Sequence, residues 1–323
     1  MVTWDQPPLL LELGHTTLDV DGRAVTLRAQ ARVYAFGVIC LLLQWPLHDV
    51  PWTQVTAQAQ ALDRAADAAA GGAPWLPLLD DVCAALGDAL QRPQRAQVQE
   101  DYLLVRIWRW REPQDGATLA QRLDVPALLA GEHEALAEST RRELLRHSHA
   151  WYADELLALT WDRALIVDPR ADADTDDASA MLELANAQLL ELRWYDAMLD
   201  EEWPRMQALV AGTRRPLVAF LPGRMARLAR RMQVQVTEVN ELIERVEGTL
   251  QSTGDTWLAR VHGSARDALG VPALAAALER KLALMRETYR GLYEEAAGLR
   301  ATLLEATIVA LIVIELLLAL WRH

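Results

Sequence analysis

The stretch Leu303-Leu-Glu-Ala-Thr-Ile-Val-Ala-Leu-Ile-Val-Ile-Glu-Leu-Leu-Leu-Ala-Leu-Trp321 decides how the rest of the chain is interpreted. It contains no Pro, Gly, Lys or Arg. As a helix, about 19 residues extend roughly 28 Å, which is close to the thickness of one hydrocarbon core. Trp321 suits the boundary between lipid and water. The stretch therefore predicts a single transmembrane helix at the C-terminal end, over residues 303–321.

Two carboxylates interrupt this apolar stretch. Glu305 lies near one end, where its side chain can reach the interface. Glu315 lies about two turns from the other end, and a carboxylate inside a membrane costs a few kcal/mol unless it is protonated or paired. We therefore expect Glu315 to face a partner helix and to support self-association. The alternative is a helix that is buried in protein rather than in lipid.

A regular apolar seam leads into the predicted membrane helix. Its members alternate at spacings of four and three residues from Leu278 through Leu282, Met285, Tyr289, Leu292, Ala296 and Leu299 to Leu303. This is a heptad pattern, and no Pro follows Pro272, so one continuous helix of roughly 50 residues is predicted. Packing within the chain explains the seam better than an intermolecular coiled coil, and a helix from Arg224 to Leu250 is the expected antiparallel partner.

The whole pattern predicts an α+β protein with a mixed α/β head domain (residues 1–170), a helical, coiled-coil-like stalk (171–302) and the membrane helix (303–321). Within the head, apolar runs and alternation predict strands at Arg32–Leu43, Tyr102–Trp110 and Ala164–Asp168, with weaker candidates at Leu9–Leu13 and Val25–Leu27. Helical spacing predicts helices at Thr53–Ala70, Leu76–Leu90, Val125–Leu157 and Ala178–Leu199.

The charge balance limits the classes of partner. The formal net charge of −13 makes nucleic acid an unlikely partner, because a phosphate backbone is repelled overall. A local basic face nevertheless remains for an anionic partner such as lipid or RNA, and its members are Arg224, Arg227, Arg230 and Arg231. A solvated helix face explains the same four arginines, and we favour that alternative.

The two cysteines and the N-terminus indicate a compartment. Cys40 and Cys83 lie in apolar contexts without a CxxC motif, as expected for buried thiols in a reducing compartment. The N-terminus has no basic region and contains two prolines, so neither a signal peptide nor a transit peptide is predicted. We therefore expect the bulk of the chain in the cytoplasm and its end in the cytoplasmic membrane.

Two patterns resemble metal sites. Asp172, Asp174 and Asp176, with Glu183 at the twelfth position, imitate a calcium loop, but Asp177 replaces the Gly of the sharp turn. An acidic loop that caps the following helix explains these aspartates equally well. His133 begins a zinc-protease pattern that lacks its second histidine.

A pair of histidines is the remaining metal candidate. His147 and His149, with Asp154 and Glu155 nearby, could hold a metal, but no third ligand stands at a diagnostic spacing. We therefore favour the interpretation that both are surface histidines without a metal. Because phosphate-binding glycine loops and nucleophile elbows are also missing from the sequence, we assign no catalytic residue, no metal and no cofactor, and an enzyme is not the favoured class.

Four stretches resemble the "required for meiotic nuclear division" family, a domain of unknown function. Val33–Val38 (VYAFGV) looks like its N-terminal strand, and Ala135–Ser139 (ALAES) resembles its ALAQS helix. Asn186–Asp200 (NAQLLELRWYDAMLD) is similar to the ELRYYD…LD helix of bacterial members. Leu304-Glu305 and Ile308–Leu317 resemble its membrane tail.

The resemblance implies an architecture more than an activity. Eukaryotic members include a mitochondrial inner-membrane protein that forms homo-oligomers and supports translation, and no catalytic residue can be carried over. Our leading hypothesis is accordingly a membrane-anchored, homo-oligomeric scaffold or adaptor, in contact with the lipid bilayer through Glu305, Glu315 and Trp321, that tethers translation or membrane-biogenesis components. The alternatives are a metal-dependent membrane-bound enzyme that uses His133, His147 and His149, and an RNA or ribosome tether.

Overall fold

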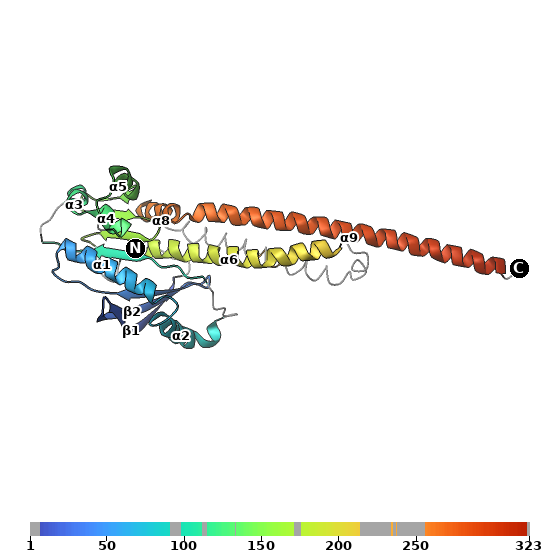
Figure 1. Cartoon of the computed structure of the whole chain (residues 1–323), viewed down its shortest axis with the longest axis horizontal. Helices are drawn as coiled ribbons and strands as arrows, with labels where there is room; N and C mark the ends of the chain where they lie inside the picture. Colours follow the sequence, from blue (N-terminus) through green and yellow to red (C-terminus); the bar gives the residue numbers. More distant parts are fainter. Residues whose placement is uncertain are drawn as a thin grey trace. The chain divides into compact units, whose positions relative to one another are not determined.

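The computed structural model describes residues 7–90, 98–111, 115–132, 134–170, 176–213, 234, 237 and 256–321 (Figure 1). The chain forms two compact units, Met1–Trp194 with Arg245–Leu274, and Tyr195–Glu244 with Ala275–His323. The described residues form a mixed α+β fold, as the sequence predicts. The domain boundaries at residues 170 and 302 remain predictions.

The first sheet of the first unit is an antiparallel meander in the order β1-β2-β3. Strands β1 (Leu9–Val20) and β2 (Arg23–Val33) are joined by Asp21 and Gly22, whose φ angles of 50° and 76° make the left-handed pair that a tight hairpin needs. Both weak strand candidates are therefore confirmed, and both strands are longer than predicted.

The run Arg32–Leu43 is a hairpin rather than one strand. β2 ends at Val33, the chain turns over Tyr34–Gly37, and β3 (Ile39–Gln44) returns alongside it. Gly37 has a φ of +102°, which few other residues adopt, and its N–H donates to the carbonyl of Tyr34 at 2.9 Å. The uniform apolar character of the run conceals this turn.

The second sheet has the order β4-β7-β6-β5 and is mixed. β4 (Leu103–Ile107) runs parallel to β7 (Arg163–Val167), and β6 (Leu156–Leu159) is antiparallel to both β7 and β5 (His147–His149). The strands predicted at Tyr102–Trp110 and Ala164–Asp168 are thus confirmed as β4 and β7, with shorter bounds.

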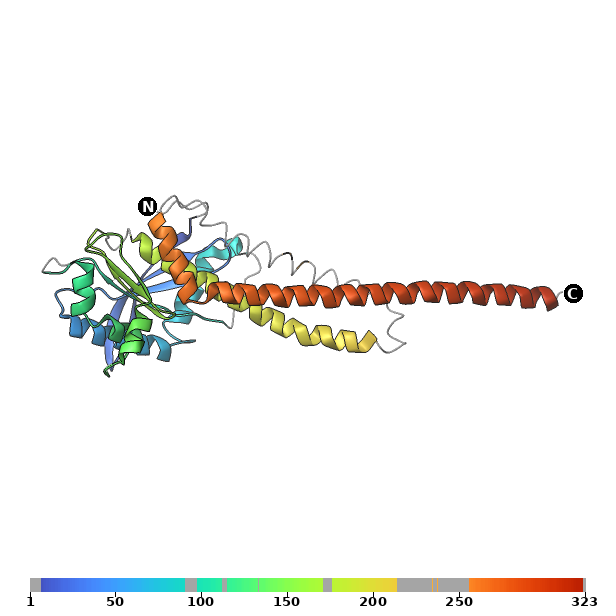
Figure 2. The same ribbon diagram turned by 90° about the horizontal axis from the view of Figure 1, so that it is seen from above.

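The helices of the first unit cover these sheets (Figures 1 and 2). Their bounds are α1 (Trp52–Ala68), α2 (Trp75–Leu86), the 3₁₀ turn η1 (Gly87–Ala89), α3 (Gly116–Arg122), α4 (Val125–Ala130), α5 (Glu138–Leu144) and α8 (Thr256–Ala268). The predicted helix Thr53–Ala70 is confirmed as α1. The prediction of a helix over Val125–Leu157 is wrong, because Gly131 (φ +67°) ends α4 in a left-handed cap and the segment goes on to form α5, β5 and β6.

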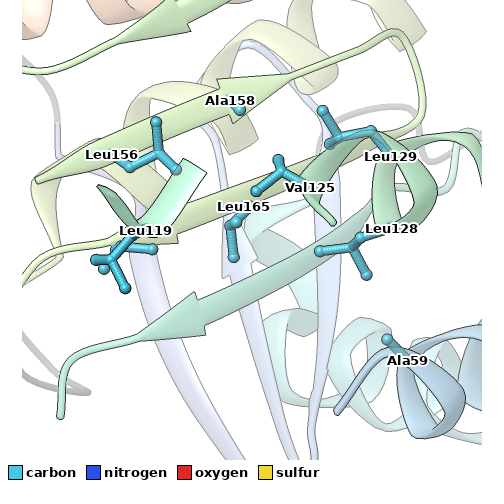
Figure 3. Close-up of a cluster of buried hydrophobic side chains, with 9 residues drawn as sticks. Ala59, Leu119, Val125, Leu128, Leu129, Leu156, Ala158 and Leu165 are labelled. Carbon is cyan, nitrogen blue, oxygen red and sulfur yellow. The ribbon is translucent and has the colours of Figure 1, made fainter. Parts of the chain in front are cut away.

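One hydrophobic core lies on a face of the second sheet (Figure 3). Leu156 and Ala158 of β6 and Leu165 of β7 point to this face, since alternate residues of a strand share a side. The helices contribute Ala59 from α1, Leu119 from α3 and Val125, Leu128 and Leu129 from α4. A separate cluster of Leu18, Val20, Leu27 and Ala61 holds α1 to the first sheet.

The second unit contains the later parts of two long helices. These are α6 (Asp177–Thr213), which keeps Pro204 inside it, and α9 (Val271–Trp321), whose 51 residues confirm the predicted continuous helix. Within this unit the two helices lie side by side, and Lys281 of α9 donates to Asp196 at 2.6 Å and Asp200 at 2.8 Å (Figure 2).

The start of the predicted seam is buried within the chain. Leu278, Leu282 and Met285 are at most 4% exposed, as expected for intramolecular packing. The later seam side chains lie outside the described residues, as does the helix expected at Arg224–Leu250 apart from residues 234 and 237.

The prediction of a transmembrane helix over residues 303–321 is not supported. Among the described residues, no helix combines the length and the apolar character that a membrane crossing requires. The carboxylates of Glu305 and Glu315 interrupt the segment, and a carboxylate in hydrocarbon is costly. The predicted localisation, a single-pass protein of the cytoplasmic membrane, is therefore corrected as well.

Candidate functional site

Two histidines share one face of the edge strand β5. His147 pairs with Leu159 and His149 with Leu157, so both imidazoles lie on the side of the sheet opposite to the core of Figure 3. Ser148, between them, points to the other side. The alternation of the strand therefore brings the two rings together without any further element.

Helix α8 places a serine against both rings. Leu258, Val261, His262 and Ala265 are buried at the spacing of one helix face, which fixes the rotation of α8 on the sheet. Ser264 lies at the margin of that face. Its Oγ is 3.2 Å from Nδ1 of His147 and 2.7 Å from Nε2 of His149. The nitrogens of two histidines on one strand thus lie close to the oxygen of a serine that is 115 residues beyond His149 in the sequence.

The surroundings of His149 favour its neutral form. Burial, the neighbouring His147 and the positive charge of Arg260 lower the pKa of its imidazole below 6.5, in that order of importance. A neutral imidazole offers one nitrogen as an acceptor, so His149 can accept the hydroxyl proton of Ser264 while His147 donates to the same oxygen. All three side chains are half-buried.

This arrangement contains a hydroxyl beside a base, and it also contains two converging metal-ligand nitrogens. A serine nucleophile works with a base that is itself oriented by a third group and with donors for an oxyanion. Among the described residues, no group of three or more His, Cys, Asp and Glu is placed to hold a metal. The geometry alone therefore assigns no reaction.

The acids predicted to assist the histidines are paired with an arginine instead. Arg170 donates to Asp154 at 2.6 Å and to Glu155 at 3.2 Å, and its guanidinium stacks 4.2 Å from the centre of the Tyr152 ring. Burial raises the pKa of Glu155, while its backbone donors and Arg170 act in the opposite direction. The two carboxylates stabilise the loop between β5 and β6.

Asp176 and Glu183, the two described residues of the calcium-like pattern, have separate roles in the structure. Asp176 caps α6, accepting from the backbone N–H of Ser179 at 3.0 Å, which confirms the capping interpretation for this residue. Glu183 accepts from Arg32 at 2.7 Å and from the Tyr34 hydroxyl at 3.0 Å. Burial raises the pKa of Glu183 against the opposing effect of these two partners. Asp172 and Asp174 lie outside the described residues.

The remaining predicted site residues divide into two groups. Glu305, Glu315 and Trp321 are exposed on α9, and Trp321 is 94% exposed. Large apolar side chains that are about half exposed accompany them, namely Ile308, Val309, Leu311, Ile312, Val313, Ile314, Leu317 and Leu318. His133 and the basic face of Arg224, Arg227, Arg230 and Arg231 lie outside the described residues.

Comparison with known proteins places the first part of the chain in a family. The family model for the N-terminal domain of the uncharacterized protein MJ0711 matches residues 1–174, which is more than half of the chain. The uncharacterized protein MJ0711 of Methanocaldococcus jannaschii is 26% identical over 223 residues, 68% of this chain. The alignment spans 66% of that protein, just under two thirds of its length. No solved structure matches the chain.

These matches overturn the resemblance to the "required for meiotic nuclear division" family. Its two most specific stretches, residues 186–200 and 304–317, lie outside the matched region, in long helices where apolar spacing recurs in unrelated proteins. Its first stretch is the turn between β2 and β3. The homo-oligomer and translation roles therefore lose the support that the resemblance gave them. The chain belongs to the family defined by the N-terminal domain of the uncharacterized protein MJ0711.

Proposed function

We propose that this protein is a self-associating scaffold or adaptor whose copies assemble through the exposed apolar segment of α9, residues 308–321. The observation that carries the proposal is the run Leu311–Ile314, in which four successive large apolar side chains are each 48–61% exposed. Successive residues are about 100° apart around a helix, so these four cover every side of it. Contiguous apolar surface of this kind marks a binding site.

A second copy of the chain is the occupant that fits this segment best. Identical segments share the same length and the same apolar character, and most soluble assemblies are homo-oligomers. One neighbouring helix covers a single stripe, so a segment that is apolar on all sides favours a bundle of at least three copies.

The energies favour association. Covering the exposed half of eight aliphatic side chains contributes at most about 6–12 kcal/mol per copy. A copy that joins a bundle also covers a comparable area on its neighbours, which brings the gain to at most about 12–24 kcal/mol. Loss of translational and rotational freedom costs roughly 4–15 kcal/mol, so the balance supports a stable assembly.

Co-purification of two differently tagged full-length copies tests the proposal. We expect the wild-type copies to co-purify and the triple variant Leu311→Gln/Ile314→Gln/Leu318→Gln to lose its partner, because it removes one apolar stripe while keeping good helix formers. The matched control is Leu9→Gln/Leu10→Gln on β1, where both side chains are 50% exposed. Equal recovery of partner by the triple variant and the wild type would refute the proposal.

Glu315 provides a second, independent test. An assembly that covers α9 must desolvate this exposed carboxylate or leave it at the rim of the contact. The substitution Glu315→Leu should therefore strengthen association and lower the concentration at which copies dissociate. Glu305→Leu, ten residues earlier, is the matched control at the edge of the segment. Dissociation of Glu315→Leu at the wild-type concentration rejects a role for Glu315 in the contact.

A further inference from the structure

The side chains of His147, His149 and Ser264 form a cluster that the proposed self-association does not use. A hydrogen bond between one histidine and a serine is enough to hold β5 against α8. Here two rings present a nitrogen to the same oxygen, Nδ1 of His147 at 3.2 Å and Nε2 of His149 at 2.7 Å. Two imidazole nitrogens and an oxygen at one point are the donor types that first-row transition metals accept.

The separations agree with a coordination shell. Ligands that lie about 2.1 Å from a metal and subtend a right angle are about 3.0 Å apart, and a tetrahedral angle separates them by about 3.4 Å. The two nitrogen–oxygen distances bracket the smaller value. Each imidazole nitrogen thus lies at a separation from the Ser264 oxygen that two ligands of one ion can have.

The scaffold holds the donors in place. The histidines alternate on a strand that pairs with β6, whose residues Leu156–Leu159 are all buried. Ser264 is carried by α8, which is anchored by its buried face. Sites built on strands and helices keep their geometry better than sites on loops.

We propose that His147, His149 and Ser264 bind a divalent transition-metal ion, with Zn²⁺ as the representative, and that water completes its coordination. Three protein donors leave at least one position open in a tetrahedral shell. Arg260 stands one turn before Ser264 on α8 and is exposed, so its positive charge opposes the cation and limits the affinity.

Titration of the full-length protein with Zn²⁺ alone, followed by calorimetry, tests this site. We expect one equivalent to bind, and His147→Gln and His149→Gln each to weaken binding at least tenfold. His15→Gln, an exposed histidine on β1, is the matched control and should bind as the wild type does. Cys83→Ser serves as the background for all variants, so that the thiol of that half-buried cysteine does not contribute.

Two further measurements keep the test decisive if a histidine variant fails to fold. Arg260→Gln leaves every donor in place and should tighten Zn²⁺ binding severalfold, because it removes the opposing charge. Co²⁺ bound by the wild type should give visible d–d absorption whose position and intensity change in Ser264→Ala, because water then replaces the hydroxyl; identical spectra would exclude the serine as a ligand. Absence of Zn²⁺ binding at 100-fold molar excess, or equal affinity in wild type and both folded histidine variants, would overturn the proposal.

Discussion

The ion pair between Arg163 of β7 and Asp63 of α1 gives the sharpest prediction about stability. Its nitrogen and oxygen are 2.5 Å apart, and the two side chains are only 16% and 15% exposed. The substitution Asp63→Asn keeps the shape of the side chain and removes its charge. The guanidinium is then left with Asp162, whose oxygen is 3.6 Å from Nε.

The expected magnitude follows from this geometry. Removing one partner of a buried pair costs about 3–5 kcal/mol. The loss of the Asp63 charge also removes its repulsion of Asp67, whose pKa is raised by burial and by the charges of Asp101 and Asp63. We therefore expect a destabilisation near the lower end, about 3 kcal/mol, which lowers the urea midpoint by roughly 1–3 M.

Urea unfolding followed by tryptophan fluorescence measures this loss. The matched control is Asp21→Asn, which breaks the exposed pair between Asp21 and Arg64 of the same helix α1, where the side chains are 66% and 62% exposed. The control should cost less than about 1 kcal/mol. If Asp63→Asn unfolds at the same urea concentration as Asp21→Asn, the claim that burial makes this pair important is wrong.

Three more predictions concern the first unit. Burial raises the pKa of Glu183 against the opposing effects of Arg32 and Tyr34, so the stability that this residue contributes is present below pH 4.5 and is lost as the pH rises. The unfolding free energy of the wild type minus that of Glu183→Gln should therefore fall from pH 4.5 upward. A difference that rises with pH would contradict the sign of this pKa shift. Gly131→Ala should destabilise by about 2 kcal/mol or more in thermal unfolding, since an added Cβ stands 1.7 Å from Nη1 of Arg163 at a φ of +67°, and an unchanged midpoint would exclude this clash. Leu165→Ala, at a fully buried position of β7, should cost about 2–5 kcal/mol by urea titration, and a loss below 1 kcal/mol would show that the site collapses around the cavity.

Strong local patterns were enough to predict several elements. Helical spacing over residues 53–70 predicts α1, and the long periodic run after Pro272 predicts the 51-residue α9. The β1–β2 hairpin carries an additional signal, because Asp21-Gly22 between alternating segments favours a tight turn. This signal could have extended both weak strand predictions.

Other elements are concealed in the sequence by uniform composition. The apolar run Arg32–Leu43 gives no alternation at its turn, and the conformation of Gly37 depends on the pairing of β2 with β3. The four residues Leu156–Leu159 are too short and too uniformly apolar to be distinguished from a piece of helix. Sheet pairing decides both cases, and local sequence does not encode it.

The candidate site shows the same limit. His147 and His149 are recognisable as a pair from their spacing alone. Ser264 is 115 residues from His149 and sits in a helix whose buried face sets its direction, so no local spacing reveals it as the third donor. The sequence shows the apolar character of residues 303–321 directly. It does not show whether lipid or another protein surface covers these side chains.

Light scattering of the intact chain over a dilution series tests the central claim most directly. Self-association through α9 predicts a molar mass of at least three times 36.1 kDa at high concentration, which decreases on dilution. A molar mass of two chains would be consistent with self-association but would refute a bundle of three or more copies. A mass of 36.1 kDa at every concentration would contradict the scaffold account, since the exposed segment would then remain uncovered in water.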